Sequence, residues 1–194
     1  ISKKRALSMR KKLNLRGKMV LIYCGRLSKE KNLEFLLKVF KKVHFKAKNS
    51  RLLIVGGGPI EEDLKKLVEK LKISDSVTFT GYINYEKVYD FYHVADLFVS
   101  TSTSEIHPFT LIEAMASKLP AIAFESPGFS DSIKNGVNGT IVKQKTAESF
   151  TKAVVKIISN PKRLKKMGEE SLRESKKYYS PVVMNQVEDL YKQL

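Results

Sequence analysis

The chain has 194 residues, which is long enough for one domain with its own core, and its 42% hydrophobic content is ordinary for a soluble protein. No run approaches the roughly 18 consecutive apolar residues of a membrane-spanning helix, and no apolar stretch follows the charges of residues 1–5 to make a signal peptide. We therefore expect a cytoplasmic protein. The net charge of +16 suits nucleic acid, anionic lipid headgroups or an acidic neighbouring domain, and charge alone does not choose among them.

The first residues are strongly basic. Residues 1–18 contain no acid, and half of the excess charge lies there, in Lys3, Lys4, Arg5, Arg10, Lys11, Lys12, Arg16 and Lys18. A solvated helix face is the simplest interpretation of such a segment. Because the chain starts at Ile1 rather than at methionine, we interpret it as a piece of a longer protein in which residues 1–17 are a linker or helix.

Short apolar runs alternate with amphipathic patterns along the rest of the chain. The runs predict six buried strands, at residues 20–23, 52–55, 77–80, 97–99, 121–124 and 140–142. Apolar residues at helical spacing predict helices over residues 33–43, 60–71 and 150–158, followed by two more helical stretches after Pro161. Continuously apolar strands separated by helices indicate a doubly wound α/β fold, a six-stranded parallel sheet with helices on both faces.

The single cysteine, Cys24, lies within the first apolar run, so we interpret it as a small core residue rather than a catalytic one. Two glycine-rich segments are interpreted as turns. Gly56-Gly57-Gly58-Pro59 permits a tight turn with Pro59 in the first helical position, and residues 136–139 form a turn into the last strand.

Two loops are expected to form the ligand site. In doubly wound sheets ligands bind beyond the carboxyl ends of the strands at the switch point, which lies between the first and fourth strands in the common order 3-2-1-4-5-6. The first of these loops brings Arg26 and Lys31, and the second brings Glu105 and Glu113 beside a helix start. Cations and a helix N-terminus suit a diphosphate, whereas carboxylates suit hydroxyl groups. A nucleotide sugar has both features.

Four motifs carry a family resemblance that extends over nearly the whole chain. They are Gly25-Arg26-Leu27-Ser28-x-Glu30-Lys31-Asn32, Val55-Gly56-x-Gly58-Pro59, Val77-x-Phe79-Thr80-Gly81-Tyr82 and Glu105-x7-Glu113-Ala114-Met115-Ala116-Ser117. The chain resembles the C-terminal, donor-binding half of retaining glycosyltransferases with the GT-B fold, glycosyltransferase family 4. The resemblance implies that residues 1–17 come from a missing N-terminal acceptor domain. It also implies that residues 18–180 bind the nucleotide sugar and that residues 181–194 form a helix packed outside the sheet or against the missing domain.

The resemblance implies a role for each candidate site residue. Arg26 and Lys31 would bind the donor diphosphate and neutralise charge on the departing nucleotide, and Glu105 would lie beside the transferred sugar; these three are the catalytic candidates. Glu113 would accept hydrogen bonds from the ribose hydroxyls, and Tyr82 and Ile83 would flank the base. The other donor-binding candidates are Gly25, Gly56, Gly58, His107, Pro108, Phe109, Thr110 and Leu111.

One departure from the family pattern affects the sugar pocket. The family usually has glycine directly after its first glutamate, whereas this chain has Ile106-His107-Pro108, where His107 would cap the helix or position sugar hydroxyls. This segment and residues 126–131 resemble members that glucosylate membrane lipids such as diacylglycerol. The chain has no Asp-x-Asp pair to hold a metal-bound diphosphate, so we predict donor binding without a metal or other cofactor.

The functional prediction is therefore hexose transfer, with UDP-glucose as the first donor candidate and a membrane lipid or glycan as acceptor. The partners are the nucleotide sugar, the missing acceptor domain and, for a lipid acceptor, the anionic inner face of the membrane. An isolated, non-catalytic nucleotide-sugar-binding module is the main alternative. An NAD-linked dehydrogenase is disfavoured because Gly25-Arg26-Leu27-Ser28 is not Gly-x-Gly-x-x-Gly. A nucleic-acid-binding module is disfavoured because the chain has no recognition motif for it.

Overall fold

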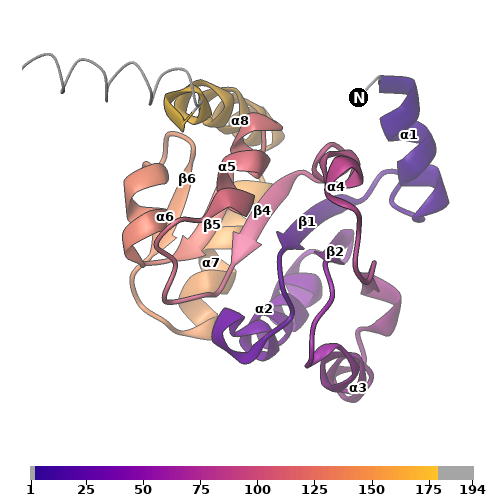
Figure 1. The fold of residues 1–194 in the computed structure, drawn as a ribbon. Coiled ribbons are helices and arrows are strands. Elements are labelled where there is room, and N and C mark those ends of the chain that lie inside the picture. The colour runs from indigo at the N-terminus through magenta and orange to yellow at the C-terminus, as the bar shows by residue number, and fades with distance from the viewer. Residues whose placement is uncertain (1–2, 179–194) are drawn as a thin grey trace, which may run out of the picture.

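The computed structural model describes residues 3–178 and contains one six-stranded parallel sheet (Figure 1). Its strand order is β3-β2-β1-β4-β5-β6, which confirms the predicted doubly wound sheet. The strands are β1 (Met19–Cys24), β2 (Ser50–Val55), β3 (Val77–Phe79), β4 (Leu97–Ser100), β5 (Ala121–Phe124) and β6 (Gly139–Val142). The prediction was wrong at Thr80: its amide still donates to the Ile54 carbonyl, but its hydroxyl turns to the Gly81 carbonyl and β3 ends one residue earlier.

Eight α-helices lie within the described residues. They are α1 (Lys3–Lys12), α2 (Leu33–Lys46), α3 (Glu61–Leu71), α4 (Tyr85–Tyr92), α5 (Phe109–Ala116), α6 (Pro127–Ser132), α7 (Ala147–Ile158) and α8 (Pro161–Ser175). Short 3-10 helices cover Lys29–Lys31, Ser74–Ser76 and Lys176–Tyr178. Helices α4 and α6 were not predicted, and Pro59 is not in a first helical position, because α3 begins at Glu61 after Ile60. The helix expected over residues 181–194 lies outside the described residues.

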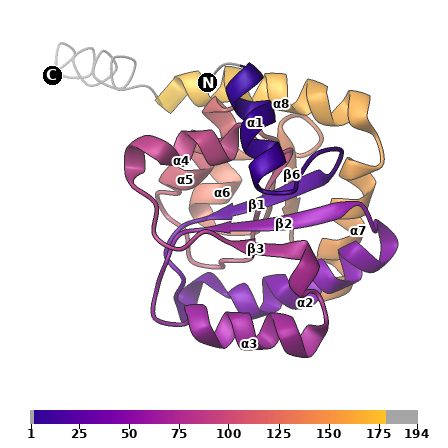
Figure 2. The same ribbon diagram turned by 90° about the vertical axis from the view of Figure 1, so that its right-hand side faces the viewer.

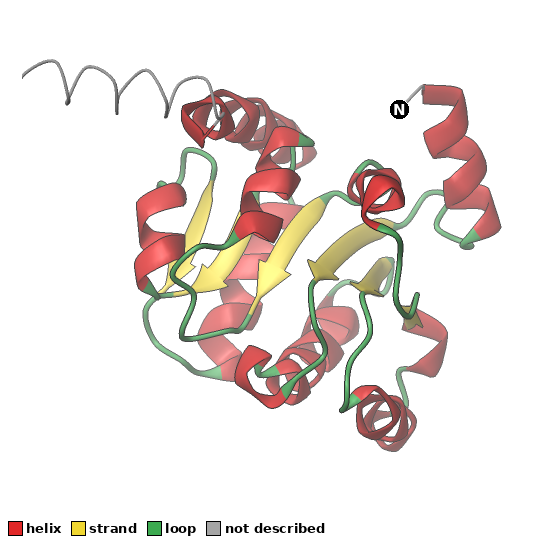
Figure 3. Ribbon diagram, in the orientation of Figure 1, coloured by secondary structure: helices red, strands yellow, loops and turns green. Residues whose placement is uncertain are grey.

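Helices cover both faces of the sheet. Helices α2, α3 and α7 lie on one face, and α1, α4, α5 and α6 lie on the other (Figures 2 and 3). Strand β1 shows why its sequence is continuously apolar: Leu21 and Tyr23 pack toward the first group of helices, and Val20, Ile22 and Cys24 toward the second. Burial of Cys24 confirms that it is a core residue.

Arginine side chains attach the basic N-terminal segment to the rest of the domain, and Arg5 pairs with Asp90 of α4. Arg10 of α1 donates to the Asp96 carboxylate at 2.6 Å and to the Val94 carbonyl at 2.9 Å, just before β4 begins. Burial raises the pKa of Asp96, and Arg10 opposes this shift. Helix α1 is therefore held against the domain rather than extended as a free linker. Within residues 3–178, no helix is both long and apolar enough to cross a membrane.

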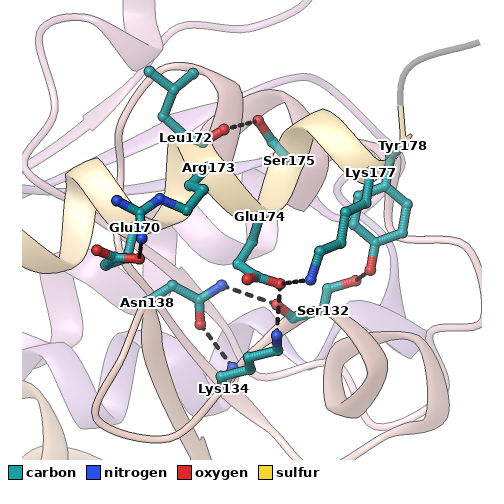
Figure 4. A network of polar contacts seen from close by, with 10 residues as sticks. All are labelled: Ser132, Lys134, Asn138, Glu170, Leu172, Arg173, Glu174, Ser175, Lys177 and Tyr178. Carbon is teal, nitrogen blue, oxygen red and sulfur yellow. Dashed lines mark hydrogen bonds and ion pairs between the residues drawn. The ribbon is translucent and has the colours of Figure 1, made fainter. Parts of the chain in front are cut away.

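The turn before β6 is tied to α8 through Asn138 and Lys134, and Figure 4 shows the side-chain contacts of both residues. The Asn138 side chain accepts a hydrogen bond from the Lys134 amide at 2.7 Å and donates one to the Ser132 carbonyl at 2.9 Å. The backbone carbonyl of Asn138 accepts a hydrogen bond from the Ser171 hydroxyl of α8 at 3.1 Å. Lys134 also forms an ion pair with Glu174 of α8 at 2.9 Å. The predicted turn over residues 136–139 is confirmed, with Gly136 at a φ of +78°.

Candidate functional site

The two predicted loops meet at the carboxyl ends of β1 and β4, which are neighbours in the sheet. Residues 25–32 connect β1 to α2, and residues 101–108 connect β4 to α5. Thr101 and Asn32 tie the loops together: the Thr101 hydroxyl donates to the Asn32 carbonyl at 2.9 Å, and the Asn32 side chain donates back to the Thr101 carbonyl at 3.3 Å. This juxtaposition confirms the switch-point argument and fixes the distance between the loops.

The loops enclose a cavity of about 270 Å³. Its walls include most of the candidates from the two loops: Gly25, Arg26, Lys31, Glu105, His107, Pro108, Phe109 and Thr110. Part of the cavity wall is apolar, with Phe98 and Phe129 among the lining residues. The combination of apolar walls with a few polar groups is typical of a small-molecule site.

A second cavity of about 420 Å³ adjoins the first. It lies between the ends of β1 and β2 and the start of α4, and it brings in Gly56, Tyr82 and Ile83. Cys24, Gly25 and Arg26 line both cavities, so the two form one continuous cleft. Tyr82 is 87% exposed beside this cleft.

The charged groups in the cleft are not equivalent. Lys31 Nζ lies 2.7 Å from Glu105 Oε1, and both side chains are largely buried, so these two charges neutralise each other. Arg26 is exposed and forms no ion pair with any carboxylate of residues 3–178. Arg26 is therefore the cation that is directly available to an anionic ligand, whereas Lys31 becomes available only when Glu105 moves or accepts another donor.

Glu113 lies behind the cleft rather than in its lining. The buried Tyr92 hydroxyl donates to Glu113 Oε2 at 3.0 Å. Burial chiefly raises the pKa of Cys24 to about 11, and the nearby Glu113 carboxylate contributes to the same shift. Hydrogen bonding with Tyr89 and then with Glu113 raises the pKa of Tyr85 to about 12. These interactions place the Glu113 carboxylate near Cys24, which lines both cavities.

The start of α5 offers one backbone donor to the cleft. The Phe109 amide donates to the His107 carbonyl and the Leu111 amide to the Pro108 carbonyl, each at 2.9 Å. Among the described residues, the Thr110 amide has no backbone acceptor, and Thr110 lines the cavity. No side chain caps this helix, so the capping role predicted for His107 is wrong; its carbonyl makes the contact instead. Leu111 is fully buried and lines neither cavity.

The glycines between β2 and α3 allow this loop to pack closely against the loop that follows β1. A Cβ atom on Gly56, whose φ is +125°, would lie 2.1 Å from the Gly25 carbonyl oxygen, and one on Gly58 would lie 2.3 Å from that of Leu27. Gly56 still lines the second cavity, but Gly58 lines neither cavity. Gly58 therefore acts on the site through the position of the loop after β1.

Comparison with known proteins identifies the family of the chain. Residues 5–174 match the family model described as glycosyl transferases group 1. The chain belongs to this family. An alpha-monoglucosyldiacylglycerol synthase of Acholeplasma laidlawii is 30% identical over 185 residues, which are 95% of this chain and 46% of that protein. The synthase of the same name from Streptococcus pneumoniae is 36% identical over 134 residues, which are 69% of this chain and 30% of that protein. The chain thus spans less than half of these relatives.

Solved structures agree with the group 1 assignment at the level of the fold. The Anabaena protein HepE in complex with UDP superimposes with a TM-score of 0.88 at 18% identity, over the whole of this chain and 54% of HepE. The sucrose-phosphate synthase of Thermosynechococcus elongatus gives a TM-score of 0.84 at 25% identity, over 96% of this chain and 48% of that one. The chain therefore has the fold of one half of a GT-B glycosyltransferase.

Three residues of this group 1 domain support the site without having been predicted. Tyr92 and Cys24 surround Glu113, and Gly128 at the start of α6 donates its amide to the Glu105 carbonyl at 2.9 Å. A Cβ atom on Gly128 would lie 2.3 Å from the Ile106 carbonyl oxygen, so this glycine lets α6 support the loop that carries Glu105. The spacing of Val88 and Tyr92, four residues apart, is a helical signal by which α4 could have been found. No group of three or more potential metal ligands occurs within residues 3–178.

Proposed function

We propose that this chain holds the nucleotide diphosphate sugar of a hexosyltransferase, with UDP-glucose as the first candidate donor. The observation that carries the proposal is the divided cleft at the switch point, in which Arg26 lines both cavities. The sugar would occupy the smaller cavity beside Glu105, and the base would occupy the larger one beside Tyr82 and Ile83. Support comes from the family and from the structures of HepE solved with UDP and with UDP-glucose.

The charges of the cleft support a specific mechanism. Arg26 would meet the diphosphate first, and a sugar hydroxyl that donates to Glu105 would release Lys31 to the same diphosphate. Both cations would then stabilise the negative charge that develops on the departing nucleotide, an interaction that strengthens in the transition state. Binding would need no metal ion, and the transferred sugar would keep its anomeric configuration, as in the family that the chain resembles.

The acceptor belongs to the part of the protein outside this chain. We propose a separate N-terminal domain for it, because GT-B enzymes bind the acceptor mainly on their other half. The two alpha-monoglucosyldiacylglycerol synthases among the relatives favour a lipid acceptor and contact with an anionic membrane. In that arrangement the isolated chain binds the donor without transferring sugar.

Calorimetric titration of this chain with UDP, GDP, UDP-glucose and NAD, in the presence of EDTA, tests the proposal. We expect selective binding of UDP and UDP-glucose. Since a charge-assisted hydrogen bond contributes about 1.5 to 3 kcal/mol, Arg26→Ala and Glu113→Ala should each weaken binding about tenfold to a hundredfold. Arg16→Ala and Glu69→Ala, which change exposed charges outside the cleft, are the matched controls. Equal binding by all five proteins, or a preference for NAD, would contradict the proposal.

A further inference from the structure

A further pocket, larger than either cavity of the donor cleft taken alone, lies far from that cleft. It has a volume of about 620 Å³ and is formed by the second half of α2, the C-terminal end of α3 and Glu148 in the first turn of α7. Helix α2 leads directly into the start of β2, and the end of α3 leads toward the start of β3. The pocket is therefore at the amino edge of the sheet, whereas the donor cleft is at the carboxyl edge.

The rim of this pocket is strongly cationic. Six lysines line it: Lys38, Lys41, Lys42, Lys46, Lys48 and Lys72. Glu148 is the single acid in the lining, and it pairs with Lys42 at 3.5 Å and Lys46 at 3.7 Å. The other four lysines form no ion pair with any carboxylate of the described residues. The excess positive charge is local, since six cations face one anion, and it is not balanced by the protein itself.

The pocket also presents apolar surface between these lysines. Phe45, near the end of α2, is 74% exposed, and Lys48 Nζ lies 5.0 Å from the centre of its ring. Leu71 and Ile73 line the same pocket from the end of α3. A soluble anion such as inorganic phosphate would pair with the lysines but would leave the Phe45 ring in water. An anionic amphiphile would satisfy both the lysines and the aromatic ring.

We propose that this lysine-rimmed pocket docks the protein onto an anionic lipid bilayer. The lysines would contact lipid phosphates, and the Phe45 ring would enter the boundary between headgroups and acyl chains, where an exposed aromatic side chain with cationic neighbours is stabilised. The inference deepens the membrane contact given under Proposed function by assigning it a surface. It does not depend on the acceptor being a lipid.

Docking through this surface leaves the donor cleft accessible. The 14 residues of α2 span about 21 Å, and this helix runs from the loop at the donor cleft to the pocket. A bilayer in contact with Phe45 would therefore lie at the end of the domain that is opposite to Arg26 and Glu113, so a lipid acceptor would have to be brought to the cleft by the proposed acceptor domain. Lipid binding and nucleotide binding should consequently be independent in this chain.

The test is co-sedimentation of the 194-residue chain with vesicles of phosphatidylcholine alone or with 30 mol% phosphatidylglycerol (about 0.1 M salt, within the usual screening range). We expect binding only to the anionic vesicles. The triple variant Lys38→Gln, Lys41→Gln and Lys48→Gln should lose about a hundredfold in partition, at roughly fivefold for each lysine. Phe45→Ala, which keeps every charge, should lose about tenfold.

The matched control is Lys4→Gln, Lys11→Gln and Lys12→Gln on α1, which removes the same charge from exposed positions outside the pocket. An equal loss from the two triple variants, or full binding by Phe45→Ala, would overturn the proposal in favour of diffuse electrostatic attraction. Displacement of the vesicles by millimolar inorganic phosphate at constant ionic strength would reassign the pocket to a free anion. Tight single-stranded RNA binding that the pocket variants abolish, with vesicle binding unchanged, would reassign it to nucleic acid.

UDP titration of the same variants separates the two proposals. We expect unchanged UDP affinity in Phe45→Ala and in both triple variants, which also shows that they are folded. Vesicle binding without UDP binding in the unmodified chain would contradict the donor-site proposal alone. UDP binding without vesicle binding would contradict the docking proposal alone.

Discussion

Tyr92 holds the carboxylate that is proposed to bind the ribose. The Tyr92 side chain is fully buried on α4, and its hydroxyl donates to Glu113 Oε2 at 3.0 Å, which links α4 to α5. Burial raises the pKa of Tyr92 above the ordinary tyrosine value, so the hydroxyl keeps its proton and remains a donor. We therefore expect Tyr92 to be a positioning residue that acts on the ligand through Glu113.

Tyr92→Phe should weaken UDP binding about three- to tenfold and lower the free energy of unfolding by about 1 kcal/mol, because the hydrogen bond to Glu113 is lost without creating a cavity. Calorimetric titration and urea unfolding measure the two effects. Phe91→Leu, one position away on the same helix and partly buried, is a control for general loosening of α4. Unchanged UDP affinity in Tyr92→Phe would mean that Glu113 is held by other contacts or does not bind the nucleotide.

The ion pair between Lys31 and Glu105 leads to a prediction of tighter UDP binding, in contrast to the weaker binding expected for Tyr92→Phe. Glu105→Gln removes the carboxylate that neutralises Lys31, so that Lys31 can pair with the diphosphate without competition. Affinity for UDP should rise about threefold to tenfold, whereas UDP-glucose should gain less because a carboxylate acceptor for the sugar is lost. Parallel titrations of the variant with both ligands measure this difference. Weaker binding of UDP in the variant would show that Glu105 is needed to hold Lys31 in place.

At the scale of elements, the turn before β6 depends on one buried amide side chain. Asn138→Ala would remove the acceptor for the Lys134 amide and the donor to the Ser132 carbonyl, in a site with no exposure to water. Because the backbone groups left behind are shielded, we expect the free energy of unfolding to fall by about 2 to 4 kcal/mol. Urea unfolding measures the loss. Val137→Ala, at the exposed tip of the same turn, should change stability by less than about 0.5 kcal/mol.

Helices differ in how far they could be predicted from the sequence. Helices α2, α3 and α7 show clear apolar spacing because each buries one stripe against the sheet. Helix α6 was missed because it starts at Pro127-Gly128, a pair that is typical of turns, and its glycine is required by contact with the Ile106 carbonyl. Helix α4 was missed because four of its eight residues are aromatic and three of these, Tyr85, Tyr89 and Phe91, are not fully buried, which obscures the period.

At the scale of the whole molecule, parallel strand order was enough to bring the site loops together. The rule that ligands bind at the switch point selected the loops after β1 and β4, and they are in contact through Asn32 and Thr101. Charge pairing was beyond prediction, since Lys31 and Glu105 are 74 residues apart and their 2.7 Å contact depends on side-chain conformation. The roles of the individual site residues remain predictions for the titrations described above.

The lysine-rimmed pocket was also beyond prediction. Its lysines lie on α2, in the segment that follows α2 and at the end of α3, and only the fold shows that Lys72 joins the others around Phe45. Basic residues near the N-terminus are more conspicuous in the sequence, yet Arg10 of that segment is used to attach α1 to Asp96. The distribution of positive charge in space therefore differs from its distribution along the chain.

The position of Cys24 allows occupancy of the cleft to be followed through the reactivity of one side chain. Cys24 is the only cysteine of the chain, and it lines both cavities next to Glu113. Burial raises the pKa of the Cys24 thiol to about 11, so the reactive thiolate is scarce at neutral pH. Alkylation by a small reagent should therefore be slow at neutral pH and should become faster as the pH rises. A bound nucleotide would cover the thiol. The rate of alkylation thus measures occupancy of the cleft directly in the unmodified protein, without a label or an engineered side chain.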